Sequence, residues 1–223
     1  MTHVNYDNFA ESFAKSRKNM NWPEISYFLQ RLSSNIGVID IACGSWRLLE
    51  AYNDHFHYLP AYYYGIDISE KLLDEARKSY RGFSFFQAAM EESESYSQIP
   101  DIFKDIEKSI FCIAWLHHSM TLEERVSILA HWNTILLPGE KVYMTNWALE
   151  SPINRNSYKN ALIHGSENMF GSHDFSIKIG GYYRWYHSFS LSELEYISKK
   201  AGFTIIENRL FDGEKNFITI LEC

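Results

Sequence analysis

Residues 36–49 read Ile-Gly-Val-Ile-Asp-Ile-Ala-Cys-Gly-Ser-Trp-Arg-Leu-Leu, and this stretch decides the fold of the chain. An apolar run closes at Asp40, which is typical of a short buried strand. The small residues 42–44 make a tight turn, and apolar residues with helical spacing resume from Ser45. The stretch therefore predicts a strand, a tight loop and the start of a helix.

A strand–loop–helix unit of this kind is suited to holding a ligand. Backbone N–H groups at the helix N-terminus face the loop and can bind a polar or anionic group, while small loop residues let the ligand approach. A second strand, residues 62–66, ends at Asp67, from which a carboxylate can reach the ribose hydroxyls of a nucleotide. Two neighbouring strand ends thus predict one nucleoside site, and the alternative is a strand–turn–helix without a ligand.

The residues around these two strand ends resemble a known family. Residues 38–49 and 64–73 are similar to motif I and the acidic motif II of class I S-adenosylmethionine-dependent methyltransferases. The resemblance implies that Gly44 approaches the methionine moiety and that Asp67 holds the ribose. The residues that it implies for the cofactor site are Arg17, Asp40, Ala42, Gly44, Asp67, Ile68, Ala89, Met90 and Ala114.

Three of the cofactor positions depart from the family pattern. Ala42 and Trp46 stand where the family usually has glycine, and Ala89 stands where it commonly has an aspartate for the adenine amino group. Met90 beside it is able to pack against the adenine face or to belong to the core. These departures motivate one alternative, a methyltransferase-fold protein that has lost catalysis and serves as a binding protein.

Length and composition favour one domain without a membrane segment. The chain has 223 residues, of which 46% are hydrophobic and 16% aromatic, enough for one sizeable core. We expect a single methyltransferase domain over residues 1–223, with an N-terminal helical cap at 1–35, broken at Pro23, and a substrate lid at 151–189. Residues 151–183 are polar with scattered glycines, so we expect a long irregular loop there. The sequence shows neither a signal-peptide pattern nor a long apolar run, so we expect a cytoplasmic protein that does not enter a membrane.

Cysteine and histidine spacing gives no sign of a metal or disulfide. Cys43, Cys112 and Cys223 show no Cys-x-x-Cys spacing, so neither a disulfide framework nor a zinc site is expected. The adjacent His117 and His118 have no acidic or cysteine partner at ligand spacing, so we expect no metal. The formal net charge of -7 argues against a broad nucleic-acid-binding surface, although it is compatible with a local basic patch.

Strand and helix signals alternate along most of the chain. Ser69 is a predicted helix cap, and Thr121 with Glu124 and Ser190 with Glu193 are predicted capping boxes. Further strands are predicted at residues 83–87, 110–115, 142–145, 203–207 and 217–221, the last two as an antiparallel pair. This order predicts an α/β, Rossmann-like class I methyltransferase fold, a mostly parallel seven-stranded sheet with an antiparallel edge strand and helices on both faces.

Four further segments narrow the resemblance. Residues 6–24, 114–118, 147–150 and 184–194 are together similar to the tRNA wobble-uridine carboxymethyl methyltransferases. The resemblance implies methyl esterification of 5-carboxymethyluridine in a tRNA anticodon loop, with S-adenosylmethionine as the donor. It also implies a small zinc-binding activator protein as a partner, as in the eukaryotic members.

A carboxylate acceptor suits this residue set. A carboxylate is already ionised at pH 7, so the protein needs no general base and has only to align an oxygen with the methyl group. We expect Arg184, assisted by His187 or His118, to grip the acceptor carboxylate. An ordinary ion pair on the lid is the alternative for Arg184.

The aromatic residues near the lid have two interpretations. Trp147, Trp185 and Tyr186 are able to stack a splayed uracil or to pack in the core. Basic residues near the N-terminus and in the lid are few for tRNA binding. The second hypothesis is therefore a class I methyltransferase for a small-molecule carboxylate or amine.

Overall fold

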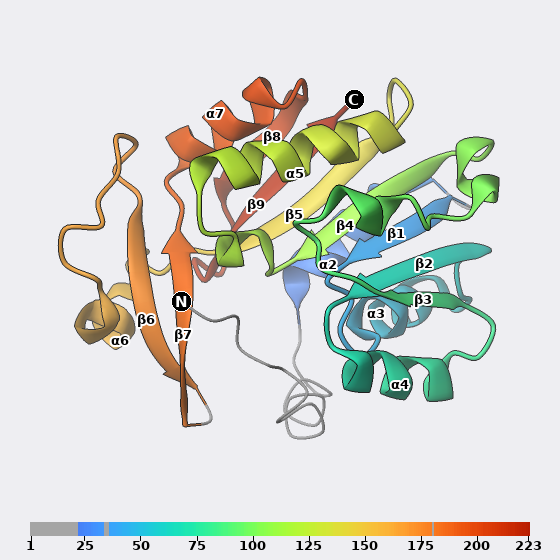
Figure 1. Ribbon diagram of the computed structural model, residues 1–223, viewed down its shortest axis with the longest axis horizontal. Helices are drawn as coiled ribbons and strands as arrows, with labels where there is room; N and C mark the ends of the chain where they lie inside the picture. Colours follow the sequence, from blue (N-terminus) through green and yellow to red (C-terminus); the bar gives the residue numbers. More distant parts are fainter. Residues whose placement is uncertain (1–21, 34–35, 180) are drawn as a thin grey trace. The chain divides into compact units, whose positions relative to one another are not determined.

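The computed structural model describes residues 22–33, 36–179 and 181–223 (Figure 1). The chain comprises two compact units, residues 1–112 and 113–223. Arg17 and most of the predicted N-terminal cap lie outside the described residues. Within the described residues, none of the helices has the length and hydropathy needed to span a bilayer.

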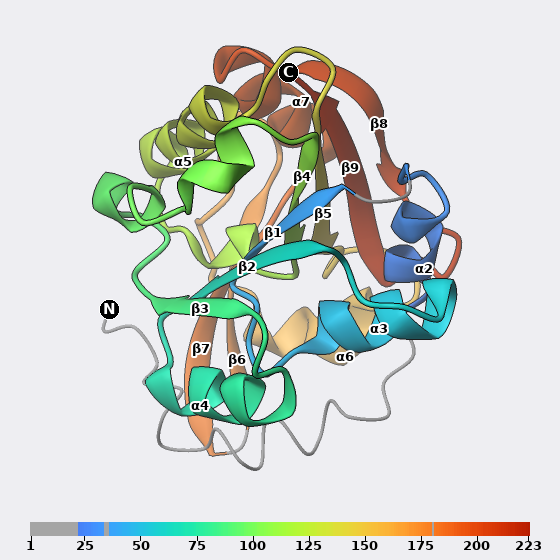
Figure 2. The same ribbon diagram turned by 90° about the vertical axis from the view of Figure 1, so that its right-hand side faces the viewer.

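The first unit is built on parallel strands. They are β1 (Gly37–Ile41), β2 (Tyr62–Asp67), β3 (Ser84–Gln87) and β4 (Lys108–Ile113). In this unit β2 pairs with β1 and β3, and β1 pairs with β4, all in parallel. The chain moves in one direction from β1 to β3, so right-handed crossovers place the two connecting helices on the same face. Figures 1 and 2 show these helices, α3 (Arg47–Phe56) and α4 (Glu70–Ser79), on one side of β2 and β3.

Helix caps in the first unit follow the local sequence. The Ser69 side chain accepts a hydrogen bond from the Leu72 N–H at 3.3 Å, which confirms the predicted cap of α4. Helix α2 (Pro23–Leu29) begins at Pro23, where the sequence predicts a break, because a first-turn proline has no N–H to leave unpaired; the segment before Trp22 lies outside the described residues. Between β3 and β4 the chain forms two short 3₁₀ helices, η2 (Ser93–Tyr96) and η3 (Asp101–Lys104).

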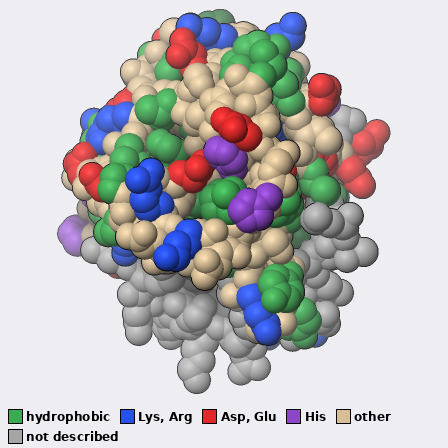
Figure 3. All heavy atoms as spheres, turned by 90° about the vertical axis from the view of Figure 1, so that its left-hand side faces the viewer, with side chains coloured by type: hydrophobic (Ala, Val, Ile, Leu, Met, Phe, Trp, Pro, Cys, Tyr) green, Lys and Arg blue, Asp and Glu red, His purple; other side chains and the backbone are tan. Residues whose placement is uncertain are grey.

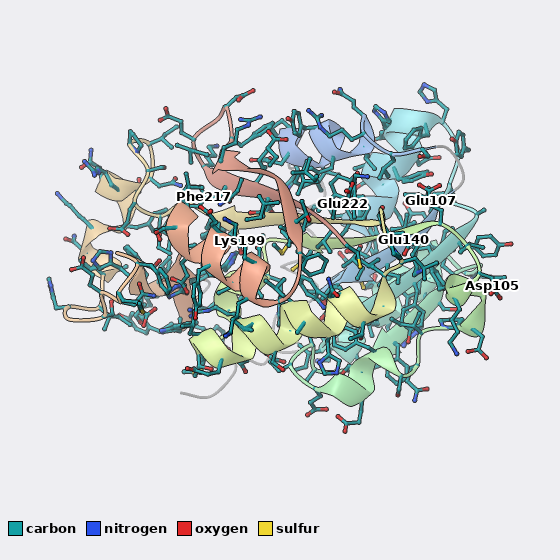
Figure 4. All side chains as sticks on the ribbon, turned by 90° about the horizontal axis from the view of Figure 1, so that it is seen from above. Asp105, Glu107, Glu140, Lys199, Phe217 and Glu222 are labelled. Atoms are coloured by element: carbon teal, nitrogen blue, oxygen red, sulfur yellow. The ribbon has the colours of Figure 1, made fainter. Side chains whose placement is uncertain are left out.

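The second unit holds an antiparallel group of strands under two helices. The elements are η4 (Leu116–His118), α5 (Leu122–Ile135), β5 (Lys141–Trp147), α7 (Leu191–Lys200), β8 (Thr204–Leu210) and β9 (Asn216–Glu222). Strand β9 pairs antiparallel with both β5 and β8. Phe217 and Glu222 lie at opposite ends of β9, and Lys199 lies in the last turn of α7 (Figure 4).

The seven strands form one sheet in the order β3-β2-β1-β4-β5-β9-β8. The sheet is mostly parallel, with antiparallel pairing at the β8 edge, as the sequence predicts. The capping box of Thr121 and Glu124 at the start of α5 is confirmed as well.

The predicted irregular lid has regular structure over much of its length. It contains α6 (Arg155–Tyr158), η5 (Lys159–Ala161) and an antiparallel hairpin of β6 (His173–Ile179) and β7 (Tyr182–Ser188). Buried Phe175, Ile177 and Tyr186 pack with Leu149, so alternate hairpin residues form a small core. The expectation of an irregular loop was therefore wrong here, because glycines around the strands obscure the two-residue alternation. That this segment is a lid stays a prediction.

Candidate active site

The loop after β1 adopts glycine-type backbone angles at three alternate positions. Ala42 and Gly44 have φ of 58°, and Trp46, just before α3, has φ of 128°. Only glycine adopts such angles without a steric cost. A Cβ added to Gly44 would meet no heavy atom of the described residues within 4 Å, so the backbone there is open to a close approach.

The carboxylate of Asp67 is fixed at the end of β2. The Gly44 N–H donates to its Oδ2 at 2.8 Å, and the Ser69 N–H donates to its Oδ1 at 2.9 Å. These two contacts fix the orientation of the carboxylate, and that it holds a ribose stays a prediction. The next residue, Ile68, is 38% exposed and offers an apolar surface beside the carboxylate.

Asp40 is buried in β1, one residue before the strand ends at Ile41. Burial raises the pKa of Asp40 to about 7, although a hydrogen bond from the Tyr63 hydroxyl at 2.7 Å and the charge of Arg47 oppose this shift. The nearby charge of Asp67 adds to it. Asp40 is thus a carboxyl group that changes its charge near neutral pH.

The segment after β3 is tied down by hydroxyl groups from η2. The Ser95 hydroxyl donates to the Ala89 carbonyl, and the Tyr96 hydroxyl donates to the Met90 carbonyl at 2.6 Å. The Met90 side chain is buried. These bonds fix the backbone of Ala89 and Met90, and their contact with a cofactor stays a prediction.

In the second unit, aromatic rings and histidines gather around Tyr186. Its ring stacks on Trp147 with the centroids 5.1 Å apart and an interplanar angle of 10°. The rings of His118 and His117 lie 4.6 and 5.4 Å from it. The Nδ1 atom of His118 lies 3.3 Å from the Trp185 carbonyl oxygen. Two of the predicted stacking residues, Trp147 and Tyr186, therefore come together with His118, whereas Trp185 contributes only its backbone and its ring stacks with His187.

His117, which no sequence signal distinguishes from His118, is a neutral buried imidazole. Burial and the neighbouring His118 hold the pKa of His117 well below its usual range. The Trp147 N–H donates to His117 Nδ1 at 3.4 Å, so the ring proton is placed on Nε2.

A buried network of charges surrounds His187. Its Nδ1 lies 2.7 Å from Asp174 Oδ1 and its Nε2 lies 2.9 Å from Glu193 Oε2. The other oxygen of Glu193 accepts a hydrogen bond from Arg125 Nη1 at 2.7 Å. The Asn168 amide donates to Glu193 Oε2 at 2.8 Å. The network joins α5, α7, β6 and β7, and it engages both ring nitrogens of His187.

The predicted second capping box is only half formed. The Ser190 hydroxyl accepts a hydrogen bond from the Glu193 N–H, but the Glu193 carboxylate does not return to the Ser190 N–H. It turns instead to the buried Arg125 guanidinium and the His187 ring, because a hydrogen bond to a charged donor is stronger than one to a backbone N–H. Burial alone would raise the pKa of Glu193, but the hydrogen bond and charge of His187, with contacts from Ser172 and Asn168, lower it to about 2.

The predicted site residues divide between the two units. The first unit holds Asp40, Ala42, Gly44, Asp67, Ile68, Ala89 and Met90. The second holds Ala114, His118, Trp147, Arg184, Trp185, Tyr186 and His187. Arg184 is buried in β7, opposite Ile177 of β6. Ala114 has φ of 57°, and its N–H donates to the Thr145 hydroxyl at 3.0 Å.

Residues 38–139, a range that begins within β1 and ends after α5, match the family model described as a methyltransferase domain. The chain belongs to the class I S-adenosylmethionine-dependent methyltransferases. The first unit of this methyltransferase fits the cofactor of its family. Asp67 is an oriented carboxylate at a strand end, and the open backbone at Gly44 lies beside it. In the described part of the chain, no three His, Cys, Asp or Glu side chains are grouped to hold a metal ion.

Two relatives bear more specific names. The methyltransferase is 30% identical over 169 residues to the tRNA (carboxymethyluridine(34)-5-O)-methyltransferase ALKBH8 of Macaca fascicularis, a match to 76% of this chain and 23% of that protein. It is 29% identical over 157 residues to the tRNA (carboxymethyluridine(34)-5-O)-methyltransferase of Saccharomyces cerevisiae, covering 70% of this chain and 51% of that one. The chain thus spans about a quarter to a half of the length of these relatives.

A solved structure supports the fold. The complex between the Haloferax volcanii Trm112 methyltransferase activator and a methyltransferase contains a chain that superposes with a TM-score of 0.69. The superposition covers 100% of this chain and 97% of that one, at 14% sequence identity. At this identity the likeness concerns the fold alone.

Proposed function

We propose that this methyltransferase esterifies a carboxylate on a uridine of tRNA, a group like 5-carboxymethyluridine. The observation that carries the proposal is a buried guanidinium, Arg184, two residues along β7 from the stacked pair of Tyr186 and Trp147. A guanidinium binds a carboxylate with two parallel hydrogen bonds, and an aromatic face binds a splayed base. The names of the two relatives point to the same acceptor.

The charge of the surrounding segment supports a nucleic-acid acceptor. Residues 151–188 carry four basic residues, Arg155, Lys159, Lys178 and Arg184, and two acidic residues, Glu167 and Asp174. Arg184 is buried and assigned to the acceptor carboxylate, so the other charged residues of this segment leave an excess of one positive charge, in a chain whose formal net charge is -7. A local excess of positive charge is what contacts to phosphates require.

The residues of the second unit have separate roles in this proposal. S-adenosylmethionine, when bound, supplies a methyl group activated by the sulfonium charge. The acceptor carboxylate needs no base, so the protein has to hold its oxygen in place and exclude water. We assign the grip on the carboxylate to Arg184 with His118. His187, engaged on both sides by carboxylates, is assigned to positioning β7 and not to the acceptor.

The test is methyl transfer to tRNA that carries unesterified 5-carboxymethyluridine. Labelled S-adenosylmethionine should give tRNA whose label is released by mild alkali, because a methyl ester hydrolyses there and an N-methyl or C-methyl group does not. Since the Haloferax structure contains an activator protein, the assay is run with and without a protein of that kind.

Variants sharpen the test. We expect Arg184→Gln to lower kcat/KM roughly 100-fold, for the loss of about 3 kcal/mol of charge-assisted binding. Arg81→Gln, which changes an exposed arginine of the first unit outside this segment, is the control and should have little effect. A folded protein that binds S-adenosylmethionine but labels no tRNA would contradict the proposal. Labelling of small carboxylates or amines in that case would support the second hypothesis.

A further inference from the structure

The segment after β5 carries two exposed positive charges. Arg155 in α6 and Lys159 at the start of η5 are exposed, and residues 151–163 contain no acidic residue. Among the described residues, neither side chain has an ion-pair partner. Glu150, which precedes the segment, has its Oε2 atom 2.9 Å from His173 Nδ1. The two cations are therefore available to an anionic partner.

The two charges lie on one side of a helical turn, together with Tyr158. Residues three and four apart are neighbours on a helix, and Lys159 continues α6 with helical backbone angles. Arg155 thus has Tyr158 and Lys159 as neighbours on the same side. The turn is fixed by Asn154, whose amide donates to the Ala148 carbonyl oxygen at 2.9 Å. A turn that is already ordered lowers the entropy cost of binding.

Tyr158 joins this turn to the aromatic rings of the candidate acceptor site. Its ring centroid lies 6.2 Å from that of Trp147, which stacks on Tyr186. Tyr158 also packs against the small hairpin core that includes Tyr186 and Ile177. Ile177 is the cross-strand partner of Arg184, and opposite residues of an antiparallel pair share a face. Tyr158 therefore lies on the face of the hairpin that carries Arg184 and Tyr186.

We propose that the α6 patch, defined as Arg155, Tyr158 and Lys159, binds the phosphates next to the acceptor uridine in an RNA loop. The inference rests on the proposed function and names a further contact of the same substrate. The Arg155 guanidinium binds a phosphate through two parallel hydrogen bonds, and the Lys159 ammonium binds one as a point charge. Tyr158 holds both charges beside the base that stacks on Trp147.

The surroundings of the α6 patch favour RNA over a small acceptor. Figure 3 looks onto the face of the second unit that carries α6 and β6, where lysine and arginine side chains lie beside histidine and apolar side chains. Side chains one helical turn apart have Cβ atoms about 5–6 Å apart, so both cations can reach phosphates of one strand. A small carboxylate or amine has no phosphate for them to bind.

The experiment measures how salt weakens the binding of an anticodon stem-loop RNA with 5-carboxymethyluridine. Each phosphate contact to a single strand contributes about 0.7 to the slope of log K against log salt. The double variant Arg155→Gln/Lys159→Gln should therefore reduce the size of this slope by about 1.4. Arg155→Lys should keep the slope, because the charge is retained. Turnover of the free nucleoside, which has no phosphate, should stay close to that of the wild type.

Lys178→Gln is the matched control, because Lys178 is an exposed cation on the opposite face of the β6–β7 hairpin, and it should keep the wild-type slope. If the enzyme methylates the stem-loop and the double variant keeps the wild-type slope, the inference is overturned and the proposed function stands. An equal loss of turnover for the nucleoside and the stem-loop would also overturn it, since α6 would then act through Trp147. A wild-type protein that binds S-adenosylmethionine but no RNA would overturn both.

Discussion

Replacement of Glu193 by glutamine should destabilise the protein severely, although the side chain keeps its size. Glu193 has no exposed surface, and its two oxygens contact Arg125 and His187 at 2.7 and 2.9 Å. Glutamine removes the negative charge that both partners face. Arg125 and His187 are themselves buried, so water cannot replace the lost carboxylate.

Two arguments lead to a similar loss of unfolding free energy for Glu193→Gln. Breaking a buried ion pair by removing one partner costs about 3–5 kcal/mol. The folded protein lowers the pKa of Glu193 from 4.5 to about 2, and a shift of that size corresponds to about 3 kcal/mol of stability at neutral pH. We therefore expect Glu193→Gln to lower the free energy of unfolding by about 3 kcal/mol at pH 7.

The sign of the pH dependence follows from the same shift. A carboxyl group with a lowered pKa stabilises the fold above its unfolded value of 4.5, and this contribution is lost as the pH falls toward about 2. The difference between the wild type and Glu193→Gln should therefore be constant at neutral pH. It should shrink as the pH is lowered below 4.5.

Urea unfolding followed by circular dichroism measures the effect. The matched control is Glu195→Gln, two residues along α7, where an exposed ion pair with Lys199 is expected to contribute less than about 1 kcal/mol. In the double variant Arg125→Met/Glu193→Gln the total loss should be smaller than the sum of the single losses, because neither charge is left alone. Equal stabilities for Glu193→Gln and Glu195→Gln would refute the role given to the network.

Three further predictions concern the first unit. The pKa of Asp40 is raised from 3.8 to about 7, so between these pH values the wild type should lose about 1.4 kcal/mol of stability per pH unit relative to Asp40→Asn. Urea unfolding measures this loss, and an equal difference between the two proteins at pH 5 and pH 7 would contradict it. Ala42→Gly should raise the free energy of unfolding by about 0.5–1 kcal/mol, because glycine adopts the positive φ of this position without the steric cost that alanine has. A lower melting temperature of the variant would contradict this prediction. Gly65→Ala should cost about 1–3 kcal/mol in urea unfolding, because the new Cβ would lie 2.8 Å from Cys43 Sγ, whereas Gly82→Ala, in open space, should cost little.

Elements set by local chemistry could be predicted from the sequence. The cap at Ser69, the capping box at Thr121 and the strand that ends at Asp67 depend on residues within a few positions of one another. The order of these elements then led to the correct sheet class, because parallel strands need helical crossovers between them.

Long-range pairing could not be predicted in the same way. Glu193 at the third position of α7 matches a capping box, and the sequence offers no sign that Arg125, 68 residues earlier, is its partner. His187 was expected to grip the acceptor because an imidazole in an aromatic segment offers the right chemistry. Its two carboxylate partners become visible only when β6 and α7 are in place. The hairpin itself depends on cross-strand contacts between residues that the local pattern does not connect.

The loop at residues 42–46 shows why a motif can change while its structure is retained. Ala42 and Trp46 occupy positive φ angles that glycine would adopt without strain, so the backbone path does not depend on glycine. Hydrogen bonds hold this path, one from the Gly44 N–H to Asp67 and one from the Cys43 N–H to the Ile66 carbonyl at 3.0 Å. Local strain of about 1–3 kcal/mol per residue persists where the surroundings fix the conformation, and it is concentrated at functional sites. Hydrogen bonds therefore hold the loop although two positions with glycine-type angles carry side chains, and the effect of Ala42 and Trp46 on cofactor affinity stays a prediction.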